Sequence, residues 1–72
     1  MATHHRIPPL TESERAALML EVRRAGETAA SRRLGLSRNL MARALARLKI
    51  QAGSVLLIRN ALATVTREAK AA

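Results

Sequence analysis

The side chains that could do chemistry in this chain are cationic and lie in its middle and C-terminal parts. Residues 28 to 67 contain no carboxylate, and their cations are Arg32, Arg33, Arg38, Arg43, Arg47, Lys49, Arg59 and Arg67. Guanidinium and ammonium groups donate hydrogen bonds and carry positive charge, so their chemistry is the binding of anions such as phosphates. A field of one sign over such a stretch indicates a polyanionic partner. The alternative is an ordinary solvated surface.

The residue types that the chain lacks exclude most catalytic and metal chemistry. It has no Cys, Asp or aromatic residue, and its two histidines, His4 and His5, stand side by side near the N-terminus. No set of nucleophile, general base and orienting group can be assembled from the remainder, so we expect no enzyme activity and no cofactor. Adjacent histidines without further ligands make a poor metal site, and we expect neither a metal nor a small-molecule ligand.

The length and the charge bound the class of protein. A chain of 72 residues forms one small domain, with a marginal core because it buries only about 60% of its unfolded surface. Without a disulfide, it is expected to gain stability as a dimer. The net charge is +8, yet the cations are spread over several short elements and no apolar run reaches about 18 residues. We therefore expect no membrane association, and a cytoplasmic, nucleoid-associated location.

Hydrophobic spacing and capping residues predict a compact all-α domain of four helices. The first begins at Thr11, which forms a capping box with Glu14, and ends at Gly26. The second covers about residues 27–34 and ends at Gly35, because the turn needs a left-handed residue. The expected organisation is a flexible basic arm over 1–9, the folded domain over 10–68 and a frayed tail over 69–72.

The third helix is predicted over residues 38–48, with Ser37 as its N-cap. Its apolar residues follow helical spacing and should face the core; they are Met41, Ala44, Leu45 and Leu48. The other side mixes long polar residues with small alanines, which lets a helix enter a groove without obstruction; this side holds Arg38, Asn39, Ala42, Arg43, Ala46 and Arg47. An ordinary solvated helix would more often carry Glu–Lys pairs there.

The fourth helix is predicted to start after Gly53, with Ser54 as its N-cap, and to end near Glu68. One apolar stripe serves the core, namely Val55, Ile58, Leu62 and Val65. Further apolar residues widen this face beyond what one small core needs. We expect the excess to meet a second copy of the chain through Leu56, Leu57 and Ala61, together with Leu20 of the first helix. Complete burial within the monomer is the alternative.

Residues 30–45 resemble the helix-turn-helix of small phage and plasmid repressors of the Cro and lambda-repressor-like group. That group has a small residue in the first helix, then Gly at the turn, an aliphatic residue and a Ser or Thr cap. The matching residues are Ala30, Gly35, Leu36 and Ser37, with Met41 and Leu45 where the recognition helix is anchored. Two departures are Ser31, where the group commonly has Ala, and the absence of Gln at the start of the third helix.

The resemblance implies distinct roles for the polar residues. Base contacts are implied for Ser37, Arg38, Asn39, Ala42 and Arg43. Phosphate contacts are implied for Thr28, Arg32, Arg33 and Arg47, with the backbone N–H groups that open the second helix. An Arg can pair with guanine O6 and N7, and an Asn with adenine N6 and N7, each giving about 1–3 kcal/mol of discrimination.

From these observations we expect a regulator that binds double-stranded DNA sequence-specifically, most simply a repressor that binds an inverted repeat as a homodimer. Its recognition helix, about residues 38–48, would lie in the major groove. The alternative is an architectural or recombination-related factor that bends DNA with the same helices. A specificity ratio near one over random DNA would favour that alternative.

Overall fold

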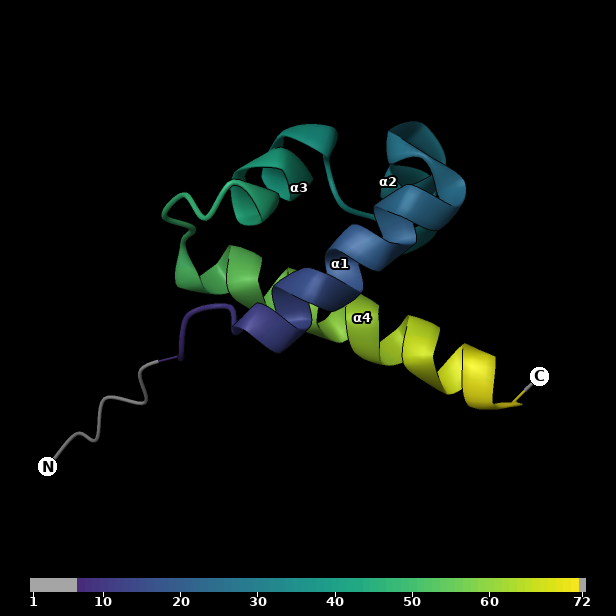
Figure 1. The fold of residues 1–72 in the computed structure, drawn as a ribbon. Coiled ribbons are helices and arrows are strands. Elements are labelled where there is room, and N and C mark those ends of the chain that lie inside the picture. The colour runs from purple at the N-terminus through teal and green to yellow at the C-terminus, as the bar shows by residue number, and fades with distance from the viewer. Residues whose placement is uncertain (1–6, 72) are drawn as a thin grey trace, which may run out of the picture.

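The described part of the chain forms four helices, as the sequence predicts. The computed structural model describes residues 7–71, and of residues 69–71 only the backbone. The helices are α1 (Glu12–Ala25), α2 (Glu27–Leu34), α3 (Arg38–Leu45) and α4 (Ala52–Ala71), and no strand occurs in the described part. Figure 1 shows α4 as the long lower helix, with α2 and α3 above it and α1 crossing between them. Most of the expected arm and its two histidines lie outside the described residues.

The start and the end of α1 are set by local hydrogen bonds. The Thr11 Oγ1 accepts from the Glu14 N–H at 3.1 Å, and a Glu14 carboxylate oxygen accepts from the Thr11 N–H at 2.9 Å. This is the expected capping box. At the other end, the Gly26 N–H donates to the Val22 carbonyl at 2.7 Å, with a φ of 87° that disfavours other residues. Gly26 then separates α1 from α2 without a longer loop.

The turn between α2 and α3 is fixed by three neighbouring residues and by Ser31. Gly35 is left-handed (φ 68°), and the Leu36 N–H donates to the Ser31 carbonyl at 3.1 Å. The Ser31 hydroxyl donates to the Leu36 carbonyl, so this departure from the repressor pattern ties the turn to α2. Leu36 is buried, and the Ser37 Oγ accepts from the Leu40 N–H at 3.0 Å as the predicted N-cap.

The end of α3 differs from the prediction. The helix stops at Leu45 instead of continuing to residue 48. Arg47 is left-handed, with a φ of 62°, and the Arg47 and Leu48 N–H groups donate to the carbonyls of Ala44 (3.2 Å) and Arg43 (2.9 Å). This pair of bonds is a Schellman motif with Arg in the place that usually holds Gly. Leu48, expected in the core, is consequently 51% exposed.

The bounds of α4 also differ from the prediction. The helix begins at Ala52, so Gly53 and Ser54 lie in its first turn and Ser54 is not the N-cap. The Val55 N–H donates to the Gln51 carbonyl at 3.0 Å, which puts Gln51, and not Ser54, at the N-cap position. At the other end the backbone remains helical to Ala71, beyond the boundary expected at residue 68.

The core is built from one face of each helix. Leu18 of α1, Met41 of α3 and Ile58 of α4 are the largest fully buried side chains, and Ala30 lets α2 approach them closely. The α4 stripe is buried as predicted, apart from the partly buried Leu62. The inner face of α3 is thereby fixed, and its outer face remains in contact with solvent.

Candidate nucleic-acid interface

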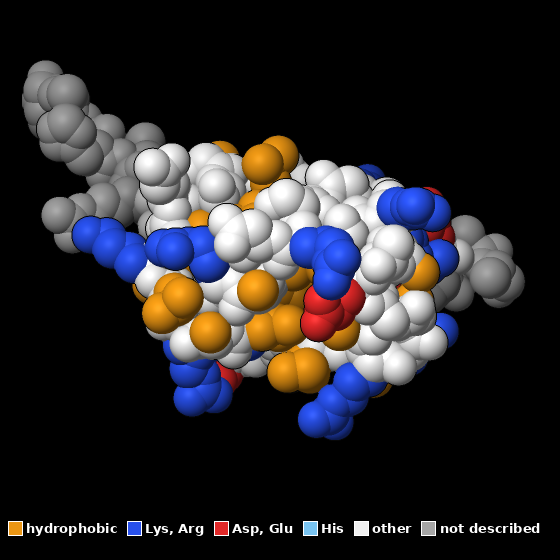
Figure 2. All heavy atoms as spheres, turned by 90° about the horizontal axis from the view of Figure 1, so that it is seen from above, with side chains coloured by type: hydrophobic (Ala, Val, Ile, Leu, Met, Phe, Trp, Pro, Cys, Tyr) orange, Lys and Arg blue, Asp and Glu red, His pale blue; other side chains and the backbone are white. Residues whose placement is uncertain are grey.

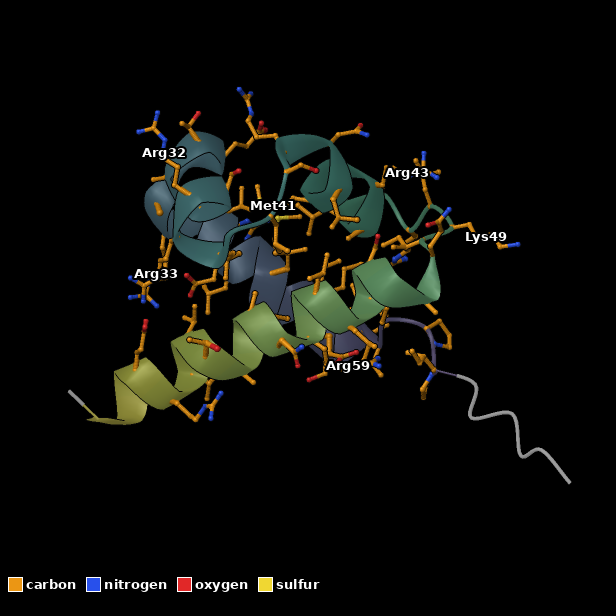
Figure 3. All side chains as sticks on the ribbon, turned by 180° about the vertical axis from the view of Figure 1, so that it is seen from behind. Arg32, Arg33, Met41, Arg43, Lys49 and Arg59 are labelled. Atoms are coloured by element: carbon orange, nitrogen blue, oxygen red, sulfur yellow. The ribbon has the colours of Figure 1, made fainter. Side chains whose placement is uncertain are left out.

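The outer side of α3 is a continuous exposed surface. Met41 and Ala44 point into the core, whereas the five residues with implied base contacts are all exposed; they are Ser37, Arg38, Asn39, Ala42 and Arg43. Figure 3 shows Met41 directed at the centre of the molecule and Arg43 directed away from it. The structure therefore brings these five residues together on one solvent-facing surface, although Ser37 uses its hydroxyl to cap α3.

Arg38 is held by a carboxylate of the preceding helix. Its Nη2 donates to a carboxylate oxygen of Glu27 at 3.1 Å, and both side chains remain about two-thirds exposed (63% and 64%). Glu27 is the first residue of α2 and Arg38 is the first residue of α3. The pair thus connects the two helices at their N-terminal ends, outside the buried turn.

Arg43 is linked to the connector between α3 and α4. Its Nη2 donates to the Lys49 carbonyl at 2.8 Å, and Figure 3 shows the Arg43 and Lys49 side chains on the same side of the molecule. A groove of about 430 Å³ lies beside them; its lining is Ser37, Asn39, Leu40, Arg43, Lys49, Ile50, Gln51 and Ser54. Lys49, Gln51 and Ser54 were not among the predicted site residues. Only the positive charge of Lys49 signalled this position in the sequence.

The four residues with implied phosphate contacts do not form one patch. Thr28 and Arg32 are exposed on α2, and Arg32 has no carboxylate within 4 Å among residues 7–68. Arg33 points toward the C-terminal part of α4 in Figure 3 and forms ion pairs with Glu21 (3.4 Å) and Glu68 (3.8 Å). Arg47 pairs with Glu12 of α1 at 2.6 Å. Arg33 and Arg47 thus serve contacts between helices.

The fold brings the glutamate carboxylates close to the cations of residues 28–67. Each of the five carboxylates has an Arg partner within 4 Å. The stretch free of acids in the sequence is therefore partly neutralised in space, which sequence order alone does not reveal. In the described part, the cations of this stretch without such a partner are Arg32, Arg43, Lys49 and Arg67. Figure 2 looks onto α2 and α3 and shows separate basic side chains, one beside an acidic side chain near the middle.

Arg59 of α4 serves the fold and does not face the α3 surface. Its guanidinium donates to the Glu14 carboxylate and, at 3.2 Å each, to the carbonyls of Pro8 and Pro9. The hydrogen bond from Arg59 is the largest of the effects that lower the Glu14 pKa, to about 2, against partial burial that raises it. The Thr11 cap lowers the pKa further. Arg59 therefore fastens α1 and the chain before it to α4.

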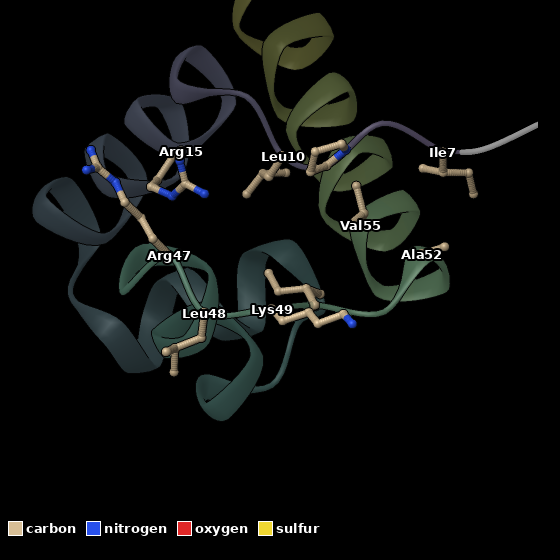
Figure 4. Close-up of a pocket in the computed structure, with 10 residues that line it drawn as sticks. Ile7, Leu10, Arg15, Arg47, Leu48, Lys49, Ala52 and Val55 are labelled. Atoms are coloured by element: carbon tan, nitrogen blue, oxygen red, sulfur yellow. The ribbon is translucent and has the colours of Figure 1, made fainter.

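A second hollow lies on the other side of the connector. Figure 4 shows it between the segment before α1, the connector and the start of α4. Its volume is about 560 Å³, and its lining is mainly apolar with three cations: Ile7, Pro9, Leu10, Arg15, Arg47, Leu48, Lys49, Ile50, Ala52 and Val55. Arg15 is committed to the Ala44 carbonyl at 2.8 Å and to Glu12. In residues 7–68, no group of three His, Cys, Asp or Glu residues could hold a metal ion.

The apolar residues implied in a dimer contact are mostly exposed. Leu20, Leu56 and Leu57 each expose about half of their surface, and Ala61 is partly buried. Leu57 and Ala61 lie one turn apart and line a shallow groove between α4 and the α2–α3 turn. Leu20 of α1 does not line this groove. Two of the four residues are thus brought into one groove.

Comparisons of the chain with protein-family models, with curated proteins and with solved structures found no match. Within the described residues, no helix is both long and apolar enough to cross a bilayer. The functional interpretation therefore depends on the geometry of the α3 surface and on its charges.

Proposed function

We propose that the chain is a sequence-specific DNA-binding regulator whose α3 outer surface reads base edges in the major groove. The observation that carries the proposal is the exposure of Arg38, Asn39 and Arg43 on one side of a helix whose opposite side is fixed in the core by Met41 and Ala44. A rigid helix with planar donors on its outer side suits recognition of base acceptors. The short turn and the capped start of α3 keep that geometry constant.

The charge distribution supports a nucleic-acid partner. The chain carries a net charge of +8, and Arg32, Arg43 and Lys49 have no carboxylate partner in the described part of the chain. Arg32 lies on α2 and Lys49 lies in the connector after α3, so these two flank the base-reading surface to which Arg43 itself belongs (Figure 3). Cations on both sides of a reading helix are suited to the two phosphate strands of a groove.

The same proposal includes a homodimer that represses transcription from an inverted-repeat site. Exposed leucines on α4 provide apolar surface for a second copy, and two-fold symmetry of the protein requires a matching dyad in the DNA. The proposal includes no enzymatic step, cofactor or small-molecule effector. In this proposal the protein binds the DNA of the nucleoid in the cytoplasm.

The proposal is tested by selecting duplexes from a random pool with the purified chain. We expect a recovered motif with a dyad and half-sites about 34 Å apart. Arg43→Ala should change the preferred base at one position, whereas Arg67→Ala, which removes an exposed arginine from α4, should leave the motif unchanged. If the chain binds duplex DNA but no motif is recovered, the architectural alternative is favoured. If the chain does not bind duplex DNA, the proposal is refuted.

A further inference from the structure

Glu27 is an acidic residue on a surface that otherwise gathers cations. It opens α2, and its carboxylate lies 3.1 Å from the Nη2 of Arg38, which opens α3. Both side chains are about two-thirds exposed, and exposed ion pairs of this kind contribute little to stability. Because α2 and α3 are already joined by the buried Leu36 and the Ser31 hydrogen bonds, the fold does not depend on this pair. Its main effect is on the Arg38 guanidinium itself.

A guanidinium has five N–H donors in a fixed plane, and Glu27 occupies part of one edge through Nη2. The remaining donors stay available for an acceptor in front of α3. A long, free Arg side chain loses conformational entropy when it forms a bidentate contact, and prior fixation reduces that loss. Arg38 is therefore presented to an incoming base in a restricted orientation.

The position of Glu27 also bears on phosphates. The N-terminus of a helix normally attracts phosphate, and the start of α2 was one expected phosphate contact. A carboxylate in the first turn opposes that contact by like-charge repulsion. Binding to DNA of any sequence depends mainly on phosphates, whereas guanine O6 and N7 are uncharged acceptors. The carboxylate consequently penalises general phosphate binding more than base recognition.

We propose that Glu27 is a specificity-determining residue, which positions Arg38 for a base contact and lowers the affinity for unrelated DNA. This inference rests on the DNA-binding function proposed above. It assigns to the N-terminus of α2 a selective role in place of the phosphate contact implied for its backbone N–H groups. The net result is a larger ratio of specific to non-specific affinity.

The test compares Glu27→Gln with Glu68→Gln. Both changes remove one exposed carboxylate that pairs with an arginine, but Glu68 lies on α4 and its partner Arg33 points away from α3 (Figure 3). Affinities are measured at several salt concentrations for the duplex recovered by selection and for a random-sequence duplex. We expect Glu27→Gln to raise the affinity for random duplex about three- to ten-fold at low salt, and Glu68→Gln to raise it about two-fold at most.

The discrimination between the two duplexes should fall about ten-fold in Glu27→Gln and remain unchanged in Glu68→Gln. In an Arg38→Ala background, Glu27→Gln should cause no further loss at the base that Arg38 reads, because the positioning acts through Arg38. Thermal unfolding of each variant checks that the fold is retained.

Equal effects of the two glutamine variants would overturn the inference and leave the DNA-binding proposal standing, because the wild-type chain would still select its motif. An additional loss of discrimination at the base that Arg38 reads, caused by Glu27→Gln in the Arg38→Ala background, would overturn the positioning role. If the wild-type chain binds neither duplex, the proposed function fails and the inference fails with it.

Discussion

The contact between Glu14 and Arg59 yields a quantitative prediction about acid stability. Glu14→Gln removes the charge but keeps an acceptor that can still reach the Thr11 N–H, since Gln also completes a capping box. The perturbation therefore isolates the ion pair, which joins α1 to α4 and lies beside the carbonyls that Arg59 holds. The substitution leaves Arg59 and Thr11 unchanged.

The magnitude follows from the Glu14 pKa, which is lowered from 4.5 to about 2, mainly by the Arg59 hydrogen bond and further by the Thr11 cap and the Arg59 charge. Each pKa unit corresponds to about 1.4 kcal/mol of unfolding free energy, so the upper limit is roughly 3.5 kcal/mol. The side chains of Arg59 and Glu14 are 28% and 22% exposed, so solvent screens the pair. We therefore expect Glu14→Gln to lower the free energy of unfolding by about 1–2 kcal/mol at pH 7.

The pH dependence has a definite sign. Because the folded-state pKa of Glu14 is lower than the unfolded-state value, its stabilisation is complete above pH 4.5 and is lost as the pH falls toward 2. Urea unfolding followed by helical circular dichroism should show the wild-type chain losing its advantage over Glu14→Gln across that interval. Glu68→Gln, whose carboxylate is exposed, serves as the control. A difference between wild type and Glu14→Gln that is absent at pH 7, or that stays constant down to pH 2, would refute the reasoning.

Three further predictions concern packing, the turn and assembly. Leu18→Ala should lower the free energy of unfolding by about 2–5 kcal/mol, because Leu18 is fully buried; a loss below about 1 kcal/mol in urea unfolding would contradict the described core. Gly35→Ala should cost about 1 kcal/mol through its left-handed φ of 68°, since no atom obstructs an added Cβ, and Gly35→Asn should restore part of the loss. Leu57→Glu should dissociate the proposed dimer in sedimentation experiments while Leu20→Glu tests the α1 contribution, and an unchanged mass for both would exclude these leucines from the interface.

The helix ends with local chemical signals could be predicted from the sequence. Thr11 and Glu14 fixed the start of α1, Gly35 the end of α2 and Ser37 the start of α3. In each case the residue satisfies a backbone group within a few positions of itself, so no distant contact is needed. The apolar spacing of α4 also predicted its buried stripe correctly.

The ends without such signals were predicted wrongly. Arg47 terminates α3 in a conformation that usually needs Gly, and its pairing with Glu12 of α1 depends on residues far away in the sequence. Gly53 resembled a helix boundary, but the first turn of α4 tolerates it because its N–H needs no intrahelical partner.

The candidate site was only partly predictable for the same reason. The exposure of Arg38 and Arg43 followed from the helical period, whereas their partners Glu27 and the Lys49 carbonyl depend on how α2 and the connector lie against α3. The orientation of Arg33 toward Glu21 and α4 also follows from packing between helices and not from the α2 sequence.

The most direct test of the central claim is a titration of the isotope-labelled chain with the selected duplex, followed through its backbone amide signals. We expect the largest changes at residues 37–43 and at the adjoining connector, where the exposed donors of α3 and Lys49 lie. The amides of α4 near Arg67 should change little. Large changes confined to α1 and α4, with the signals of residues 37–43 unmoved, would contradict the account.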